Sequence, residues 1–424
     1  MNFEQTSSFS TSSTSSTSST SSGVNRRTVL ASALGGLVSG TSLLPLHASA
    51  QTDDVKIGWI KPVTGPLASS FGPLYLAGQI AMDEINAAGG ILGRKLVKVE
   101  VDDQANPSQS PIATRKLVDQ GVKIIVGPIG SSQTLASLEV STSAKVIQAA
   151  YATATEMGDG TRFPYHYQFN FTAAAQVYRH AELLQKRGIK KVGLLIEDSA
   201  AGVSMKDAMM KELPARGMQI VSEQIFPIKV ADMTPFLRKL RSDGAEAIDA
   251  QVSNNVDITQ MLVGLSRMNW KPLIVGHTGL LFAGTPGAIP DSARYNDVYA
   301  ATFRSLTYTD TEQPPERVKA FCKKLLANDV SEALLGPAAT TPFYDYLYAL
   351  KYAVEKAKSW DSDQIKNALD SASAIDGLYG KMSFSKERHS AYDQSVVAMA
   401  VSNSMEEPLS KEYHGLFRRR AAGV

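Results

Sequence analysis

The sequence predicts an α/β protein built on parallel β-sheets, and three observations carry this prediction. Short apolar runs of the kind buried in parallel sheets recur along the chain and alternate with segments of helical spacing. This rhythm runs twice, so two βα arrays of domain size follow one another. The Gly/Pro-containing loop Thr64–Gly72 lies at the carboxyl end of the first predicted strand, where open α/β sheets bind ligands.

The first array begins with a strand over Val55–Ile60. The helix over Leu74–Asn86 follows, with Ala77, Ile80 and Ile85 on one apolar stripe. The remaining predicted elements of this array are a strand over Leu96–Val101, a helix over Pro107–Gln120, a strand over Val122–Val126, a helix over Ser131–Ser143 and a strand over Lys145–Ala150.

The second array repeats the pattern after the extended aromatic segment Tyr165–Phe171, a candidate crossover. Its predicted helices are Ala173–Arg187, Val203–Arg216, Met233–Ser242 and Val256–Met268, and its predicted strands are Val192–Ile196, Gln219–Phe226, Ala247–Gln251 and Leu273–Val275. The late predicted elements are strands over Val298–Phe303, Gly377–Phe384 and Val396–Val401 and helices over Glu316–Asn328, Thr341–Ser359 and Asp361–Ala372. Because these late elements are too few for a third domain, we expect them to complete the first two, giving a two-lobed protein with several hinge strands.

The first 50 residues predict an export signal rather than part of the fold. Residues 6–22 are Ser or Thr except Phe9, a tract with nothing to bury, which we expect to be disordered. Paired Arg26-Arg27 before a Gly/Ser-diluted apolar run resemble a twin-arginine signal, with a Sec signal as the alternative. Ala48-Ser49-Ala50 has the pattern of a cleavage site. We therefore expect a soluble protein of the periplasm.

The number and position of cysteines indicate whether the chain forms disulfides or carries an N-terminal lipid anchor. Cys322 is the only cysteine, so no disulfide forms within the chain. The absence of a cysteine near the cleavage site predicts a protein without an N-terminal lipid anchor. In its apolar surroundings, Cys322 is interpreted as a buried structural thiol.

Composition and motifs exclude several functional classes. The net charge of +2 gives no electrostatic footprint for nucleic acid, and no basic amphipathic segment indicates a membrane surface. None of the six histidines is spaced with another ligand for a metal, and no nucleophile elbow, P-loop or dinucleotide fingerprint is present. The doublet Asp102-Asp103 is interpreted as a strand end and turn, because adjacent strand residues point to opposite faces. We therefore predict a protein that is not an enzyme and needs no cofactor or metal.

Hydroxyl groups follow two neighbouring strands of the first array. Ser131 and Ser132 open a helix directly after the strand over Val122–Val126, where unpaired N–H groups and hydroxyls suit a carboxylate. The alternative is that one of them serves only as a helix N-cap. Tyr151 and Thr153 follow the next strand, so these hydroxyls are expected at the same sheet edge and form a candidate carboxylate cradle.

Two aromatic residues, Phe71 and Tyr151, are placed to wall this cradle. The alternative for each is simple core packing, and spacing does not decide between the two roles.

Four sequence segments, in this order and spacing, resemble the branched-chain amino acid-binding proteins of ABC importers. These are TGPLASSFG at Thr64–Gly72, DEINAAGGILGRKL at Asp83–Leu96, VEVDDQANPSQS at Val99–Ser110 and GVKIIVGPIGSSQT at Gly121–Thr134. That family comprises type I periplasmic binding proteins, also called leucine/isoleucine/valine-binding proteins. The resemblance implies two Rossmann-like lobes with parallel central sheets, joined by three hinge strands and closing over a ligand.

The resemblance also implies lobe boundaries and partners. The N-terminal lobe would be residues 55–171 and 301–380, and the C-terminal lobe residues 172–300 and 381–424. The closed form would dock on an ABC permease in the inner membrane, with the ligand chemically unchanged. We expect a monomer that binds a small molecule.

The family's carboxylate-binding serine falls on Ser131, its backbone-plus-threonine pair on Tyr151 and Thr153, and its first-loop aromatic on Phe71. The second lobe departs from the pattern. Amino-acid binders place a tyrosine before the glycine of the loop that follows the strand corresponding to Val192–Ile196. At that position this chain has Ala201.

Where amino-acid binders place an acidic partner for the ligand's ammonium, this chain has Thr278, next to His277. An ammonium without an acidic partner in a closed cleft is costly. Asp198, or Asp257 in the segment Ser253–Asp257, is a candidate substitute. Otherwise the ligand lacks an amine and is an aromatic or aliphatic carboxylate or an amide. His277 is either a ligand contact or a loop residue without a ligand role.

The sequence thus predicts a periplasmic solute-binding protein of an ABC importer, with a small carboxylate-bearing solute such as a branched-chain or hydrophobic amino acid. The alternatives are the same scaffold with an amine-free carboxylate or amide, or a ligand sensor for a membrane receptor. An enzyme on this fold has no positive support. The predicted ligand-binding residues are Phe71, Ser131, Ser132, Tyr151, Thr153, Asp198, Asn254, His277 and Thr278.

Overall fold

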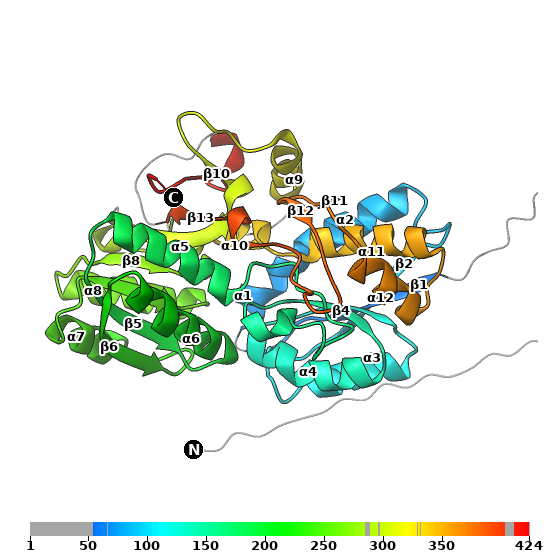
Figure 1. Cartoon of the computed structure of the whole chain (residues 1–424), viewed down its shortest axis with the longest axis horizontal. Coiled ribbons are helices and arrows are strands. Elements are labelled where there is room, and N and C mark those ends of the chain that lie inside the picture. Colours follow the sequence, from blue (N-terminus) through cyan, green and yellow to red (C-terminus); the bar gives the residue numbers. More distant parts are fainter. Residues whose placement is uncertain are drawn as a thin grey trace, which may run out of the picture. The chain divides into compact units, whose positions relative to one another are not determined.

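Two sheets organise the chain: in Figure 1 the first is blue to cyan, and the second is green to yellow apart from the strand Val397–Val401, which lies near the red end of the colour bar. The computed structural model describes residues 54–65, 67–284, 289–295, 297–328, 330, 332–402 and 411–423. The predicted Ser/Thr-rich tail and signal peptide over residues 1–50 lie outside the described residues.

The first sheet has four parallel strands in the order β2-β1-β3-β4. Their bounds are β1 (Val55–Ile60), β2 (Leu96–Val101), β3 (Ile124–Ile129) and β4 (Ile147–Tyr151). Helices α2 (Leu76–Ala87) and α11 (Phe343–Ala357) share a core with Trp59 on one face of the sheet. On the other face, α3 (Ser110–Asp119) packs on Ile125 and against α4 (Ser131–Ser143). Coverage of both faces explains why β3 and β4 are buried at every residue, whereas β2, at an edge of the sheet, has exposed residues.

The second sheet has six strands in the order β13-β9-β8-β7-β5-β6, parallel except for the β13–β9 pair. Their bounds are β5 (Lys191–Glu197), β6 (Gln219–Phe226), β7 (Ala247–Gln251), β8 (Leu273–Gly276), β9 (Val298–Phe303) and β13 (Val397–Val401). Helices α5 (Ala173–Lys186) and α6 (Ala200–Ala215) share a core with Leu194, and α7 (Thr234–Ser242) and α8 (Asn255–Arg267) share another with Leu195. Consecutive strand residues therefore face opposite helical layers.

The chain passes between the two sheets three times: after β4, after β9 and before β13. The second passage runs through β10 (Thr307–Tyr308), which pairs with β14 (Arg418–Arg419), to α9 (Glu316–Leu326), α10 (Glu332–Ala339), α11 and α12 (Ser362–Asp370). α11 packs on α2, and β13 pairs with β9, so the late elements divide between the two sheets as expected. The lobe boundaries at residues 171, 300 and 380 stay a prediction.

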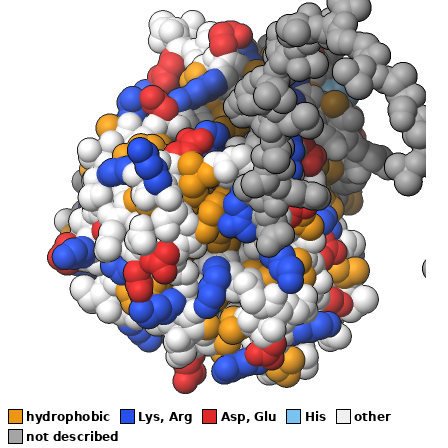
Figure 2. All heavy atoms as spheres, turned by 90° about the vertical axis from the view of Figure 1, so that its right-hand side faces the viewer, with side chains coloured by type: hydrophobic (Ala, Val, Ile, Leu, Met, Phe, Trp, Pro, Cys, Tyr) orange, Lys and Arg blue, Asp and Glu red, His pale blue; other side chains and the backbone are white. Residues whose placement is uncertain are grey.

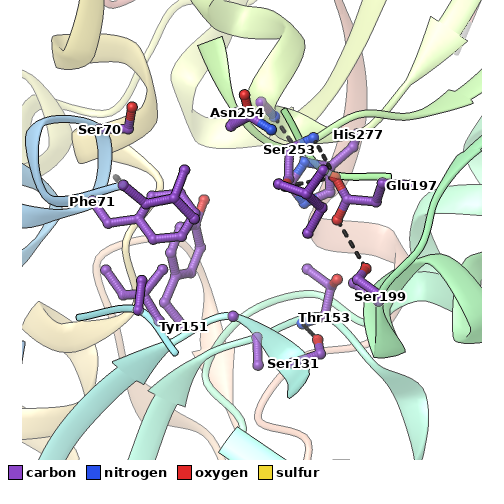
Figure 3. Close-up of a pocket in the computed structure, with 18 of the residues that line it drawn as sticks. Ser70, Phe71, Ser131, Tyr151, Thr153, Glu197, Ser199, Ser253, Asn254 and His277 are labelled. Atoms are coloured by element: carbon purple, nitrogen blue, oxygen red, sulfur yellow. Dashed lines mark hydrogen bonds between the residues drawn. The ribbon is translucent and has the colours of Figure 1, made fainter. Parts of the chain in front are cut away.

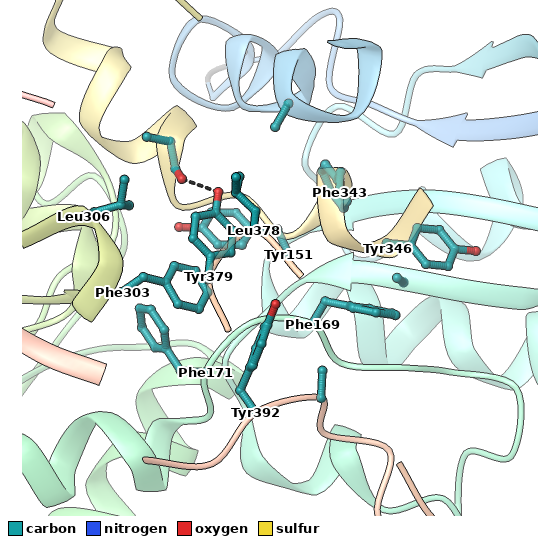
Figure 4. Packing of buried hydrophobic residues seen from close by; sticks show 14 of the residues in the cluster. Tyr151, Phe169, Phe171, Phe303, Leu306, Phe343, Tyr346, Leu378, Tyr379 and Tyr392 are labelled. Carbon is teal, nitrogen blue, oxygen red and sulfur yellow. Dashed lines mark hydrogen bonds between the residues drawn. The ribbon is translucent and has the colours of Figure 1, made fainter. Parts of the chain in front are cut away.

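One aromatic cluster joins these three passages, as Figure 4 shows. The ring of Phe303, at the end of β9, stacks on Tyr379 with centroids 3.9 Å apart. Phe171 from the first passage and Tyr392 from the third contact Phe303 edge-on, at 4.9 and 5.7 Å. All four side chains are buried, so the segments that connect the sheets share one apolar core.

The predicted strand over Gly377–Phe384 is wrong. Only β11 (Ile375–Asp376) and β12 (Lys381–Met382) pair there, as a two-residue antiparallel contact. The reason is the buried carboxylate of Asp345, which accepts the Leu378 N–H (2.5 Å) and the Tyr392 hydroxyl proton. Burial raises the pKa of Asp345, and these bonds oppose the rise. The Leu378 N–H is thus used by a side chain rather than by a neighbouring strand.

Helix α10 was not predicted, and the helix expected over Thr341–Ser359 is instead α11, which begins at Phe343. Gly336 and Pro337 lie inside α10, and both residues disfavour a helix by local propensity. Tertiary contacts with the turn Thr278–Gly284 and with α9 hold this short helix in place.

The surface mixes charges of both signs. On the face in Figure 2, Lys and Arg side chains are interspersed with Asp and Glu, in keeping with the net charge of +2. Exposed pairs such as Lys145 with Asp363 (2.7 Å) join opposite charges. In the part of the chain that the structure describes, no helix is long and apolar enough to cross a membrane.

Candidate ligand-binding site

A cavity of about 310 Å³ lies where the carboxyl ends of the two sheets face each other, and all nine predicted site residues line it. From the first sheet come residues at the ends of β3 and β4 together with α1 (Ala68–Phe71) and α10. From the second come residues at the ends of β5, β7 and β8. The sequence-based expectation of a site at strand ends is met on both sides of the cavity.

Ser131 is the first residue of α4, and its hydroxyl lies beside Thr153, as Figure 3 shows. The Thr153 and Ala154 N–H groups both donate to Ser131 Oγ, each at 3.2 Å. The N-cap of α4 is Gly130, without a side-chain cap, so the alternative that a serine only caps this helix is wrong. The Ser131 hydroxyl of the predicted cradle is therefore in contact with the backbone of Thr153, next to the N-terminus of a helix.

Gly127 explains how β3 reaches this edge. Its φ of +96° is unfavourable for other residues, and a Cβ there would lie 2.4 Å from the Ile60 carbonyl oxygen and 2.6 Å from the Tyr75 hydroxyl. The glycine lets the backbone pass close to Ile60, and β3 then continues to Ile129, where it pairs with Tyr151 of β4, past the predicted end at Val126.

Ser132 and Ser70 connect the two sides of the cavity. The N–H of Ala200, at the start of α6, donates to Ser132 Oγ (3.0 Å). The Ser70 hydroxyl donates to Asn255 Oδ1 (2.9 Å) at the start of α8. Because each bond joins a group near the first sheet to one near the second, the structure holds the cavity closed.

Phe71 and Tyr151 form an apolar wall on the side away from Glu197 in Figure 3. The Tyr151 hydroxyl lies 3.0 Å from Thr340 Oγ1, and burial raises the pKa of Tyr151 to about 12, so the phenol is neutral at physiological pH. Tyr151 belongs to the buried core and also lines the cavity, so core packing and cavity lining do not exclude each other, and its contact with a ligand stays a prediction.

On the other side, Asn254 is the N-cap of α8, and its Oδ1 accepts the Asp257 N–H (3.0 Å). Asp257 is fully buried beneath it, bonded to the Asn254 amide (2.6 Å) and the Lys229 N–H (2.8 Å). The proposal that Asp257 receives a ligand ammonium is therefore wrong, since its side chain does not line the cavity. Asp198 lines the cavity, but it is an exposed residue.

His277 and Thr278 follow β8 and are almost completely buried. His277 Nδ1 accepts the Gly279 N–H (3.0 Å), which fixes the proton on the other ring nitrogen. Burial, with a smaller contribution from His180, lowers the pKa of His277 to about 3. The imidazole is therefore neutral at physiological pH and lines the cavity as an uncharged polar group.

The sequence analysis missed Glu197, the last residue of β5. Its side chain is 3% exposed and lines the cavity. Oε2 accepts the Ser253 N–H (2.9 Å) and hydroxyl (2.7 Å), and Oε1 accepts the Ser199 hydroxyl (2.9 Å). Burial raises the pKa of Glu197, and these hydrogen bonds oppose the rise. A charged residue that ends an otherwise apolar strand was the signal available in the sequence.

The doublet Asp102-Asp103 plays the predicted structural role. Asp102 accepts the N–H groups of Val63 (2.9 Å) and Thr64 (3.2 Å), which anchors the loop after β1. Asp103 accepts the Ser110 hydroxyl (2.8 Å) at the start of α3. Among the described residues, no group of three or more His, Cys, Asp or Glu side chains is placed to hold a metal ion.

The strand ends of two sheets face one cavity of about 310 Å³, an arrangement suited to holding a small molecule. The profile of the family described as "Periplasmic binding protein" matches residues 54–404. The chain belongs to this periplasmic binding protein family.

Named relatives and solved structures agree with this family assignment. The Leu/Ile/Val-binding protein homolog 8 of Brucella suis biovar 1 is 26% identical over 364 residues, 83% of this chain and 87% of the relative. The structure of LivJ from Streptococcus pneumoniae with isoleucine has a TM-score of 0.69 at 23% identity and covers 82% of this chain and 96% of LivJ. A solute-binding protein of an ABC transporter from Rhodopseudomonas palustris BisB5, with 3,4-dihydroxybenzoic acid, has a TM-score of 0.69 at 21% identity, covering 82% and 93%. The predicted family and fold class are confirmed.

Proposed function

We propose that this chain is the solute-binding component of an ABC importer, acting as a monomer in the periplasm on a small carboxylate-bearing solute. The observation that supports this most is the closed cavity with Ser131 and Thr153 side by side at the N-terminus of α4. Helix N-termini and hydroxyls stabilise a carboxylate without needing a cationic side chain.

Closure of the cleft would be the step that the ligand controls. The Ser132–Ala200 and Ser70–Asn255 bonds form only when the two sides meet. A ligand that touches both sides binds the closed form better than the open form, so it shifts the population toward closure. The closed form then docks on the membrane permease and releases the solute unchanged.

Two ligand classes, amino acids and aromatic carboxylates without an amine, are to be compared directly, because proteins of the same fold were solved with a member of each. LivJ holds isoleucine, and the Rhodopseudomonas palustris protein holds 3,4-dihydroxybenzoic acid. The cavity has polar groups for a carboxylate and an apolar wall at Phe71 and Tyr151, which suits both classes.

We expect a carboxylate of one of these classes to raise the thermal stability of the purified protein. Since the ligand binds only the folded chain, a concentration of a hundred times Kd adds about 2.7 kcal/mol to the free energy of unfolding. The measurement is a thermal-shift screen of branched-chain amino acids, hydroxybenzoates, dicarboxylates and short amides, followed by calorimetric titration of each hit.

Each hit is then recovered and analysed by chromatography, and recovery of the unchanged compound is the expected result. If no carboxylate stabilised the protein, or if a hit were chemically converted, the proposed function would be wrong.

A further inference from the structure

The charges that line the cavity are unusual for a site that takes a carboxylate. Among the described residues that line it, Glu197 and Asp198 are the acidic groups, and no Lys or Arg is present. His277 is neutral at physiological pH because burial lowers its pKa to about 3. A ligand with only negative charge would therefore meet acidic groups without a compensating cation.

Among the residues that the structure describes, no Lys, Arg or His side chain forms an ion pair with the buried Glu197. The donors around its carboxylate are the uncharged Ser199, Ser253 and Gln251, the last at the long distance of 3.4 Å. An ionised carboxylate at 3% exposure is costly unless a cation neutralises it. Burial raises the pKa of Glu197, and a cation beside this carboxylate would favour its ionised form.

Gln251 gives independent support from the same region. It lines the cavity, and its Oε1 is buried without a hydrogen-bond partner among the described residues. Glu197 Oε1 lies 3.4 Å from the Gln251 amide nitrogen. The second-sheet side of the cavity therefore has more acceptors than donors, which favours a ligand group that donates several N–H bonds.

Figure 3 shows where this acceptor lies relative to the cradle. Glu197 and Ser199 face Thr153 and Ser131 at one end of the cavity, and Phe71 lies at the other. A ligand with adjacent carboxylate and ammonium groups would place both at the polar end. Its apolar part would point toward Phe71 and Tyr151.

We propose that Glu197 receives a positively charged nitrogen of the ligand and so selects zwitterionic solutes over carboxylates without an amine. This inference rests on the proposed function. Glu197, at the end of β5, would take the role of the acidic residue that amino-acid binders have in the loop after β8, where this chain has Thr278. Asp198 also lines the cavity, but it is exposed, so water already solvates its carboxylate and a cation there is screened.

The test compares matched ligands on the wild type and on Glu197→Gln. The pairs are leucine with 4-methylpentanoate and phenylalanine with 3-phenylpropanoate, which differ only in the amino group. We expect the amino acid that binds to do so about 10- to 100-fold more tightly than its deaminated partner. In Glu197→Gln this preference should disappear through loss of amino-acid affinity, with the deaminated acid changing less than about threefold.

The pH dependence adds a readout that a structural role of Glu197 would not move. A cation binds the ionised carboxylate, so amino-acid affinity should rise as pH rises from 4.5 through the raised pKa of Glu197. If Glu197 instead donated a proton to a ligand carboxylate, affinity would fall over that range. Measuring Glu197→Gln at the same pH values separates the contribution of Glu197 to this pH dependence from those of Asp198 and His277.

Glu223→Gln is the matched control, because Glu223 on β6 pairs with Lys206 (3.0 Å) at the surface, away from the cavity. It should leave both affinities unchanged. Equal or tighter binding of the deaminated acids by the wild type would overturn the assignment of Glu197, even if the variant did not fold. Failure of both series to bind would instead overturn the proposed function.

Discussion

Phe303→Ala is expected to lower the free energy of unfolding by about 3–5 kcal/mol, the largest stability effect predicted for this chain. The ring is fully buried, stacks on Tyr379 and contacts Phe171 and Tyr392 edge-on. Its removal leaves a cavity where the three connecting segments meet (Figure 4), and none of them is a regular element that easily closes the gap. Urea unfolding followed by fluorescence measures the change.

Ile112→Ala is the control for Phe303→Ala, because this α3 side chain is 60% exposed. It should change the free energy of unfolding by less than about 0.5 kcal/mol. A loss below about 1 kcal/mol in Phe303→Ala would show that the aromatic cluster does not hold the passages together.

Ser131→Ala is expected to act on both binding and stability. The hydroxyl accepts the buried N–H groups of Thr153 and Ala154, so its removal should cost about 1–3 kcal/mol in the ligand-free protein. Loss of its bond to a charged ligand group should weaken carboxylate binding by about 10- to 100-fold. Calorimetric titration and thermal unfolding measure the two effects separately.

Thr153→Ala separates the two effects, because it removes a cradle hydroxyl and keeps the Ser131 acceptor. Ser143→Ala is the matched control on the same helix, where the residue is exposed and bonds only to the Glu139 carbonyl (2.9 Å). Unchanged affinity in both Ser131→Ala and Thr153→Ala would contradict the carboxylate cradle.

The sequence predicted the first-sheet half of the site well because of a simple geometric rule. Parallel strands end at the same edge, so the residues that follow β3 and β4 come close together whatever the details of packing. Ser131 and Thr153 are in hydrogen-bond contact through the Thr153 N–H, as this rule requires. Their role toward a ligand stays a prediction.

The second-sheet half was harder because it depends on which face each strand-end residue occupies. Glu197 and Asp198 are adjacent in sequence, yet Glu197 is buried in the cavity wall and Asp198 is exposed. An uncertainty of one residue in the end of β5 exchanges the two roles. Asp257 was a candidate by position, but the Asn254 cap and the Lys229 backbone take its carboxylate.

The elements after β9 show a second limit of prediction from sequence: side chains far away along the chain control the local structure there. Asp345 on α11 holds the backbone at Leu378, where apolar residues alone favoured a strand. α10 forms around Gly336 and Pro337, against their propensity, because other elements pack on it. Neither effect is visible in a window of neighbouring residues.

The burial of Cys322 has a practical consequence for measuring closure. This thiol, the only one in the chain, is 0% exposed on α9, and burial raises its pKa above its usual range, so the native protein should resist maleimide labelling. A cysteine introduced at Val203, 56% exposed in the first turn of α6, would then be the single reactive position. A fluorophore attached there sits next to the Ala200 N–H that bonds Ser132. Its emission would report opening and closing in real time without removal of any native residue that contacts the solute.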